Sequence, residues 1–155
     1  LLAPLGIKPE NIFRWRSELK AEIAAEDYET NLRDFFKLEN NELPRFDLIL
    51  LGMGDDGHTA SLFPNTKAIH ETTRLAVANF VEKFDNFRLT LTPKVLNDAA
   101  NIMFLIAGKD KAAALREVIK GKREVEKYPS QLINPTNGKL TFLIDTQAAQ
   151  NLSGQ

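Results

Sequence analysis

The chain has 155 residues, of which 43% are hydrophobic and 26% are charged, and it contains no cysteine. These proportions are typical of globular domains, and the lack of cysteine excludes disulfides, thiolate metal sites and cysteine nucleophiles. A formal net charge of -1 gives no overall field that would attract nucleic acid or an anionic membrane. No apolar run approaches the roughly 20 residues of a membrane span. We therefore expect one soluble, cytoplasmic domain over residues 1–155.

The first half of the chain predicts a helix followed by a strand. Residues 17–37 place apolar side chains at helical spacing among charged ones, which predicts an amphipathic helix with Ser17 as its N-cap. The polar stretch 39–42 ends this helix before Pro44. The apolar run 46–51 stops at Gly52, which indicates a strand buried on both faces of a parallel sheet.

The second half alternates strand-like and helix-like segments. Apolar and β-branched runs predict strands, and Thr92 followed by Pro93 is typical of a helix start. The expected strands are 75–81, 88–92, 102–107 and 139–145, and the expected helices are 93–99 and 110–121. This alternation predicts an α/β fold with a doubly wound, mostly parallel sheet and flanking helices, which binds ligands beyond the carboxyl ends of its strands.

The loop from Gly52 to His58 holds the most reactive side chains of the chain. Its glycines at 52, 54 and 57 allow a ligand to approach the backbone closely. Asp55, Asp56 and His58 supply ionisable groups, and histidine titrates nearest neutrality. A plain turn with a solvated histidine is the alternative. A dinucleotide fingerprint is disfavoured because Pro64 interrupts the following segment. No metal site is expected, because no second histidine or carboxylate cluster lies nearby at helical spacing.

Several ordered sequence blocks resemble one known family. The run 46–64, FDLILLGMGDDGHTASLFP, is similar to the signature of the 6-phosphogluconolactonase family. Four further blocks resemble those of the family in the same order: Leu5-Gly6-Ile7 with residues 9–12, then residues 89–92, 108–112 and 135–138. The resemblance extends over nearly the whole chain.

The resemblance implies a sugar-phosphate isomerase-like fold and a specific reaction. The expected reaction is hydrolysis of 6-phospho-D-glucono-1,5-lactone to 6-phospho-D-gluconate, in the oxidative pentose phosphate pathway and without a cofactor. His58 would be the general base for water, and Asp56 would orient its imidazole. The partner would be the small-molecule lactone, with neither nucleic acid nor a membrane involved.

The expected substrate contacts come from the glycine loop and from two basic residues. Gly52, Gly54 and Gly57 would offer backbone amides to the substrate and to the oxyanion. Lys111 resembles a lysine that contacts the substrate phosphate and follows a buried strand at a helix start, where anions are favoured. Arg88 is a weaker candidate. The alternatives are a solvated Lys111 and an Arg88 that is only a charge at a strand edge.

Two other functions are compatible with the same superfamily. Glucosamine-6-phosphate deaminases carry a catalytic glutamate immediately before the proline of the corresponding loop, where this chain has Phe63. A non-catalytic sugar-phosphate-binding domain is the second alternative, and the intact Asp56-Gly57-His58 run argues against it. The family's N-terminal part supplies the first strands, a Gly/Ser-rich phosphate loop and an arginine. Because this chain has none of them, the resemblance implies the C-terminal portion of a longer lactonase domain.

Overall fold

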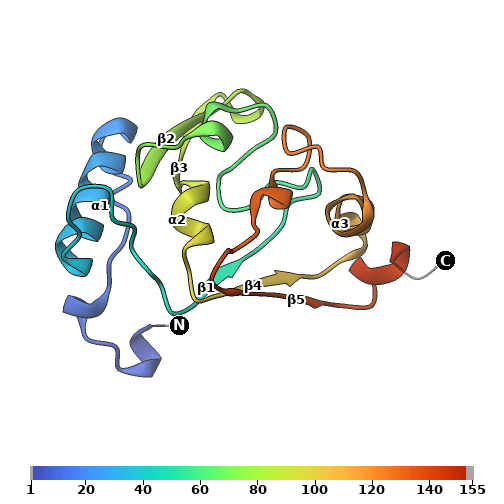
Figure 1. The fold of residues 1–155 in the computed structure, drawn as a ribbon, viewed down its shortest axis with the longest axis horizontal. Helices are drawn as coiled ribbons and strands as arrows, with labels where there is room; N and C mark the ends of the chain where they lie inside the picture. The colour runs from blue at the N-terminus through green and yellow to red at the C-terminus, as the bar shows by residue number, and fades with distance from the viewer. Residues whose placement is uncertain (1, 153–155) are drawn as a thin grey trace.

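Parallel strands and helices alternate along the part of the chain that the structure describes. The structure is a computed structural model, and it describes residues 2–152. The helices are α1 (Ala21–Phe36), α2 (Pro93–Asn97) and α3 (Ala112–Lys120), and the strands are β1 (Ile49–Leu51), β2 (Ala76–Val81), β3 (Asn86–Leu91), β4 (Asn101–Ile106) and β5 (Lys139–Ile144). Short 3-10 turns link several of these elements, and Figure 1 shows their arrangement.

Two sheets organise the strands. The first has the order β1-β4-β5 and is parallel throughout, with Leu51 beside Phe104 and Phe104 beside Phe142. The second is an antiparallel hairpin of β2 and β3. The predicted α/β class with a mostly parallel sheet is confirmed. The sequence patterns did not distinguish the hairpin from the parallel strands.

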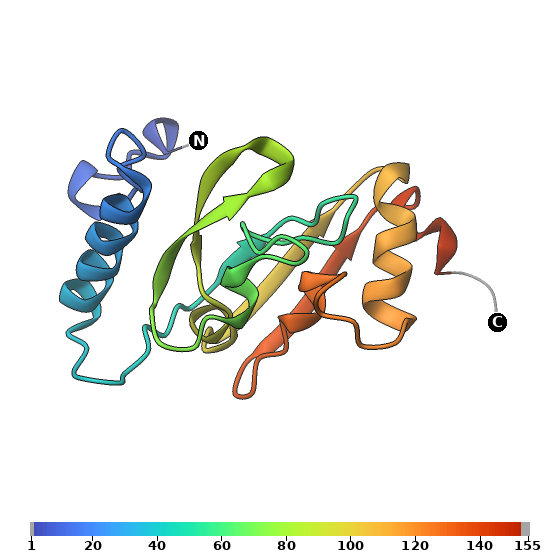
Figure 2. The same ribbon diagram turned by 90° about the horizontal axis from the view of Figure 1, so that it is seen from above.

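Only one face of the parallel sheet is covered. Phe104 is fully buried on the covered face and packs with Leu115 of α3. On the other face Leu50, Leu105 and Leu143 are 57%, 46% and 61% exposed. Figures 1 and 2 show that the hairpin and α3 lie on the same side of the sheet. The prediction that the first strand is buried on both faces is therefore wrong, because the described residues place no element over the second face.

The first helix begins later than its sequence pattern predicts. α1 starts at Ala21 after Lys20, so Ser17 is not its N-cap. The preceding segment instead runs back along the helix, where Trp15 stacks on Tyr28 with ring centroids 3.8 Å apart. Arg16 forms an ion pair with Asp27. These contacts need an extended chain before α1, and they override the helical periodicity of residues 17–20.

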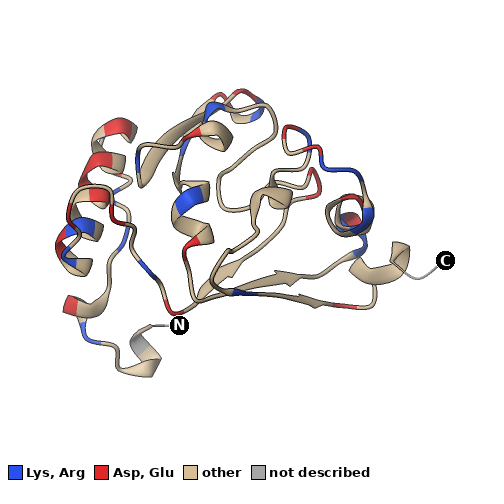
Figure 3. Ribbon diagram, in the orientation of Figure 1, with Lys and Arg blue, Asp and Glu red and all other residues tan. Residues whose placement is uncertain are grey.

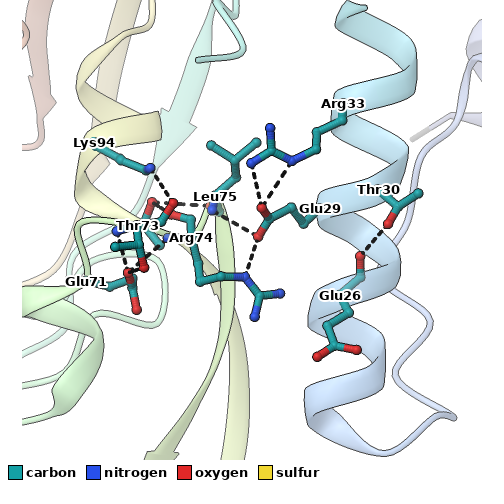
Figure 4. A network of polar contacts seen from close by, with 10 residues as sticks. Glu26, Glu29, Thr30, Arg33, Glu71, Thr73, Arg74, Leu75 and Lys94 are labelled. Atoms are coloured by element: carbon teal, nitrogen blue, oxygen red, sulfur yellow. Dashed lines mark hydrogen bonds and ion pairs between the residues drawn. The ribbon is translucent and has the colours of Figure 1, made fainter. Parts of the chain in front are cut away.

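A buried carboxylate joins α1 to the hairpin. Glu29 accepts hydrogen bonds from Arg33 (2.9 Å), from Arg74 (2.8 Å) and from the backbone N–H of Leu75 (3.1 Å). Figure 4 shows this network between the helix and the chain that enters β2. Burial opposes ionisation of Glu29, but these hydrogen bonds prevail and hold its pKa below the usual value. Glu29 therefore fixes the hairpin against α1.

Candidate active site

The glycine loop is a closed turn at the carboxyl end of β1. The N–H of Gly54 donates to the carbonyl of His58 (2.9 Å), and the N–H of Gly57 donates to the carbonyl of Gly54 (3.1 Å). The hydroxyl of the buried Thr59 donates to the carbonyl of Gly52 (2.8 Å) and ties the two ends of the loop together. Gly57 has a φ of 76°, a conformation that favours glycine. The backbone of the loop and the hydroxyl of Thr59 thus contribute to holding its shape.

Asp56 and His58 form a directly hydrogen-bonded pair. Oδ1 of Asp56 lies 2.6 Å from Nδ1 of His58 and accepts a second hydrogen bond, 3.1 Å long, from the backbone N–H of His58. A carboxylate only accepts hydrogen bonds, so Nδ1 carries the proton that joins the pair. In the neutral imidazole the lone pair then resides on Nε2, and Nε2 is the nitrogen available as a base.

The surroundings of Asp56 favour its charged form. Partial burial opposes ionisation, but the hydrogen bonds from the backbone and ring of His58 and the nearby charges of His58 and Lys83 lower the pKa of Asp56 below its usual value. Nζ of Lys83 lies 3.6 Å from Oδ2 of Asp56. Asp56 is therefore a carboxylate near neutral pH, as an orienting group for an imidazole must be.

Because Gly54 has no side chain, the side chains of Asp56 and His58 can occupy the space next to it. A Cβ built on Gly54 would collide with Nδ1 of His58 and with Oδ1 of Asp56. A Cβ built on Gly52, in contrast, would have no atom within 4 Å. Gly52 and Gly54 therefore have different roles, because of these two only Gly54 is required by the packing of the imidazole.

Most of the predicted site residues line one cleft. The cleft measures about 590 Å³, and its walls include Gly52, Gly54, His58 and Lys111. Lys111 follows β4 directly before α3 and forms an ion pair with Asp110 (2.8 Å). The cleft thus combines an imidazole and an ammonium group at the carboxyl ends of neighbouring parallel strands, the position at which such sheets bind ligands.

Two predicted substrate contacts lie outside this cleft. The carbonyl of Gly57 accepts a hydrogen bond from Ser130 (2.9 Å), and the Gly57 backbone packs against Tyr128. The guanidinium of Arg88 lies over the ring of Phe84, 4.8 Å from its centroid. Arg88 lines a separate groove that shares Trp15 and Ser61 with the cleft.

The loop amides available to an oxyanion are fewer than the sequence suggests. The N–H groups of Gly54 and Gly57 already donate within the loop. Among residues 2–152, the N–H groups of Gly52 and Met53 donate to no backbone carbonyl in the turns and loops. Both residues line the cleft. Gly52 and Met53 are therefore the loop's candidate oxyanion donors.

Three residues near the site carry no role in the sequence-based prediction. Trp15 lines the cleft, Lys83 contacts Asp56, and the ring of Phe63 stacks on His58. Lys83 lies at the tip of the β2–β3 hairpin, in a polar turn without a recognisable pattern. Trp15 is the single tryptophan of the chain, which is the only signal that would have drawn attention to it.

Two kinds of feature are absent from the described range 2–152. The His, Asp and Glu side chains in it form no group of three or more that could hold a metal ion. None of its helices combines the length and apolar character needed to cross a membrane.

The parallel sheet, with an Asp–His pair in the loop beyond its first strand, places the chain among the open α/β folds. The sequence family described as glucosamine-6-phosphate isomerases/6-phosphogluconolactonase matches residues 1–142. The chain therefore belongs to the glucosamine-6-phosphate isomerase/6-phosphogluconolactonase family.

Individual relatives agree with this membership. A 6-phosphogluconolactonase from Synechocystis is 44% identical over 128 residues, which cover 83% of this chain and 52% of the relative. The solved structure of a devB protein is similar with a TM-score of 0.84 and 32% identity, covering 95% of this chain and 61% of that chain. The 6-phosphogluconolactonase from Trypanosoma brucei has a TM-score of 0.80 and 27% identity, with 96% and 64% covered. The chain spans just over half the length of the Synechocystis relative.

Proposed function

We propose that the chain carries the acid–base half of a 6-phosphogluconolactonase, which hydrolyses 6-phospho-D-glucono-1,5-lactone to 6-phospho-D-gluconate. The observation that carries this proposal is the Asp56–His58 pair. The pair uses Nδ1 of His58 and leaves Nε2 available as a base, and His58 lines the same cleft as Lys111. Relatives named 6-phosphogluconolactonase support the choice of reaction.

In the proposed reaction His58 acts first as a base and then as an acid. Nε2 takes a proton from water as the water oxygen bonds to C1 of the lactone, and the carbonyl electrons move onto oxygen. The N–H groups of Gly52 and Met53 donate to this oxyanion. When the carbonyl re-forms, the bond from C1 to the ring oxygen breaks and His58 returns its proton to that oxygen. Asp56 remains ionised throughout and stabilises the imidazolium.

Lys111 supplies positive charge for the substrate phosphate in this proposal. The side chain of Lys111 is about three-quarters buried and pairs with Asp110, which is largely exposed. The pair holds the ammonium group near the cleft, and an incoming phosphate dianion offers it a more highly charged acceptor than Asp110. Lysine is a suitable phosphate ligand because its ammonium group has three donors.

The proposed function is tested by following three signals with the same protein. Freshly prepared lactone is added in weak buffer, and proton release is compared with the spontaneous rate. Release above that rate is the expected result, because ring opening yields an acid. Ammonia release from glucosamine 6-phosphate would instead indicate a deaminase. Binding of 6-phosphogluconate without lactone turnover would indicate a sugar-phosphate-binding domain and would contradict the proposal.

A further inference from the structure

The imidazole of His58 has a second close neighbour besides Asp56. The ring of Phe63 lies with its centroid 4.1 Å from the imidazole centroid, and the two planes are 24° apart. Phe63 is only 6% exposed. The geometry is that of a stacked pair, with the aromatic ring covering one face of the imidazole.

The contact of Phe63 with the face of the imidazole restrains a tilt of the ring that the hydrogen bond to Asp56 does not prevent. The torsion that sets the plane of a histidine ring has a broad energy minimum. The bond from Nδ1 to Asp56 holds one corner of the ring, and the ring can still tilt about that contact. A buried phenyl ring against the face opposes the tilt, and it thereby limits the directions in which Nε2 can point.

Phe63 is itself held in place from two sides. Its carbonyl accepts hydrogen bonds from the hydroxyl of Thr66 (2.7 Å) and from the Thr66 N–H (3.3 Å). Its ring meets Phe84 edge-on, with centroids 5.6 Å apart and planes at 79°. Phe84 belongs to the turn at the tip of the β2–β3 hairpin, and the guanidinium of Arg88 covers its ring. The hairpin therefore backs the ring that packs on His58.

We propose that Phe63 is a positioning residue for His58, which fixes the plane of the imidazole so that Nε2 faces the cleft. The inference rests on the proposed water-activating role of His58. A general base must lie within hydrogen-bond reach of the proton that it removes. A misplacement of about 1 Å can cost roughly 10²-fold in rate, so a restraint on ring tilt affects turnover more than binding.

The test compares three variants. Phe63→Leu removes the flat ring and keeps an apolar side chain, whereas Phe63→Tyr keeps the ring. Phe142→Leu is the matched control, because Phe142 also stacks on an aromatic ring, that of Phe104 (4.9 Å), but is partly buried against the core and belongs to β5 and not to the loop. Steady-state kinetics give kcat and KM. Proton NMR reports the ring environment directly, because His58 and His70 are the only histidines of the chain.

A positioning role predicts a specific pattern. Phe63→Leu lowers kcat about tenfold or more while KM changes little, as for a group that acts in the transition state. Phe63→Tyr restores most of kcat. In the wild type the ring protons of His58 resonate upfield of those of His70, and Phe63→Leu removes this difference. Phe142→Leu lowers thermal stability but leaves the kcat and the His58 resonances at their wild-type values.

The outcomes separate this inference from the proposed function. Wild-type turnover by a folded Phe63→Leu protein would overturn the positioning role while leaving lactone hydrolysis intact. An inactive wild type would contradict the proposed function, but the NMR comparison would still decide whether Phe63 holds the ring. If Phe63→Leu fails to fold, the wild-type spectrum suffices, because His58 resonances without an upfield shift relative to His70 would rule out the stack.

Discussion

At the residue scale, the imidazole of His58 is restrained by two different contacts and occupies space that a glycine leaves open. Asp56 bonds to Nδ1, Gly54 leaves room for the ring, and Phe63 covers one face. The contacts with Asp56 and Phe63 restrict different displacements, so together they define the position of Nε2. In the proposed reaction, preorganisation of this kind would lower the barrier, because little would have to move when His58 deprotonates water.

Replacement of Gly54 by alanine tests the packing of the pair. The added methyl group would collide with His58 and Asp56, so Gly54→Ala should cost about 1–3 kcal/mol of unfolding free energy or displace the imidazole. Gly52→Ala is the matched control and should change stability by less than about 0.5 kcal/mol. Urea unfolding and the NMR resonances of His58 measure both effects. Equal behaviour of the two variants would refute the predicted difference.

The carboxylate of Asp56 should contribute to stability in a pH-dependent way. Its pKa is lowered in the folded state, so its stabilising contribution is present above the unfolded-state pKa of 3.8 and is lost as the pH falls through the folded-state pKa. Asp56→Asn should therefore unfold more easily than the wild type at pH 6, by on the order of 1 kcal/mol. The difference should shrink toward pH 3. Urea titrations at both pH values provide the measurement, and a difference that grows on acidification would contradict the prediction.

The sequence predicted the contact between Asp56 and His58 better than the surroundings of this pair. His58 and Asp56 are two positions apart in a glycine loop, so local chain geometry was enough to suggest that they meet. The contact between Lys83 and Asp56 joins residues 27 positions apart and depends on the hairpin. Phe63 drew attention only because it replaces a carboxylate of related enzymes, and the stack on His58 became visible only in the folded chain.

At the scale of elements, the hairpin of β2 and β3 connects α1 with the glycine loop. Glu29 of α1 holds the start of β2, and the hairpin tip carries Lys83 and Phe84 to Asp56 and Phe63. The amide of Asn79 in β2 also donates to the carbonyl of Ser61 (2.8 Å), which follows the loop. A displacement of the hairpin would therefore alter several contacts that position the imidazole of His58.

Loss of the Glu29 carboxylate should weaken the attachment of α1. Glu29→Gln removes the charge that accepts from Arg33, Arg74 and Leu75, and hydrogen bonds to charged groups are worth about 1.5–3 kcal/mol. The partial exposure of both arginines places the expected loss of unfolding free energy near 1.5 kcal/mol.

Glu26→Gln is the control for this prediction, because Glu26 is an exposed residue one turn earlier whose carboxylate has no drawn partner in Figure 4. It should change the unfolding free energy by less than about 0.5 kcal/mol. Thermal or urea unfolding measures both variants. A Glu29→Gln protein as stable as Glu26→Gln would show that the network does not hold the helix.

The elements with the strongest local patterns were predicted within a few residues, and the exceptions have physical causes. β4 is apolar after Asn101, and β5 consists mainly of apolar and β-branched residues, so their positions follow from the sequence. The start of α1 is displaced because Trp15 and Arg16 pack against the helix instead of continuing it. The first turn of the helix predicted from residue 110 is a 3-10 turn, Lys109–Lys111, which precedes α3.

At the scale of the whole molecule, the parallel sheet divides the chain into a covered side and an open side. The glycine loop, the hairpin and α3 lie on the covered side (Figure 1). On the open side Leu105 of β4 is directly paired with Leu143 of β5. β1 and β4 contain no charged residue, and Figure 3 accordingly shows neither strand in red or blue. The open face therefore presents adjacent exposed apolar side chains.

The open face should bind an apolar dye. We expect ANS fluorescence to rise with the wild-type chain, and to fall when Leu50, Leu105 and Leu143 are all replaced by Thr, which retains a preference for strands. Because these side chains are exposed, each replacement should alter stability by less than about 0.5 kcal/mol. Ile23→Thr, an exposed apolar residue on α1, is the control and should leave the dye signal unchanged. Equal dye binding by the triple variant would contradict an exposed sheet face.

The most direct test of the proposed role of His58 is to compare lactone turnover by the wild type with turnover by two histidine variants. His58→Asn removes the proposed base, whereas His70→Asn removes an exposed imidazole that pairs with Glu126. With folding verified by circular dichroism, His58→Asn should lose about 10²–10⁴-fold in turnover above the spontaneous rate. His70→Asn should keep wild-type turnover. Wild-type turnover by His58→Asn would contradict the assignment of His58 as the group that activates water.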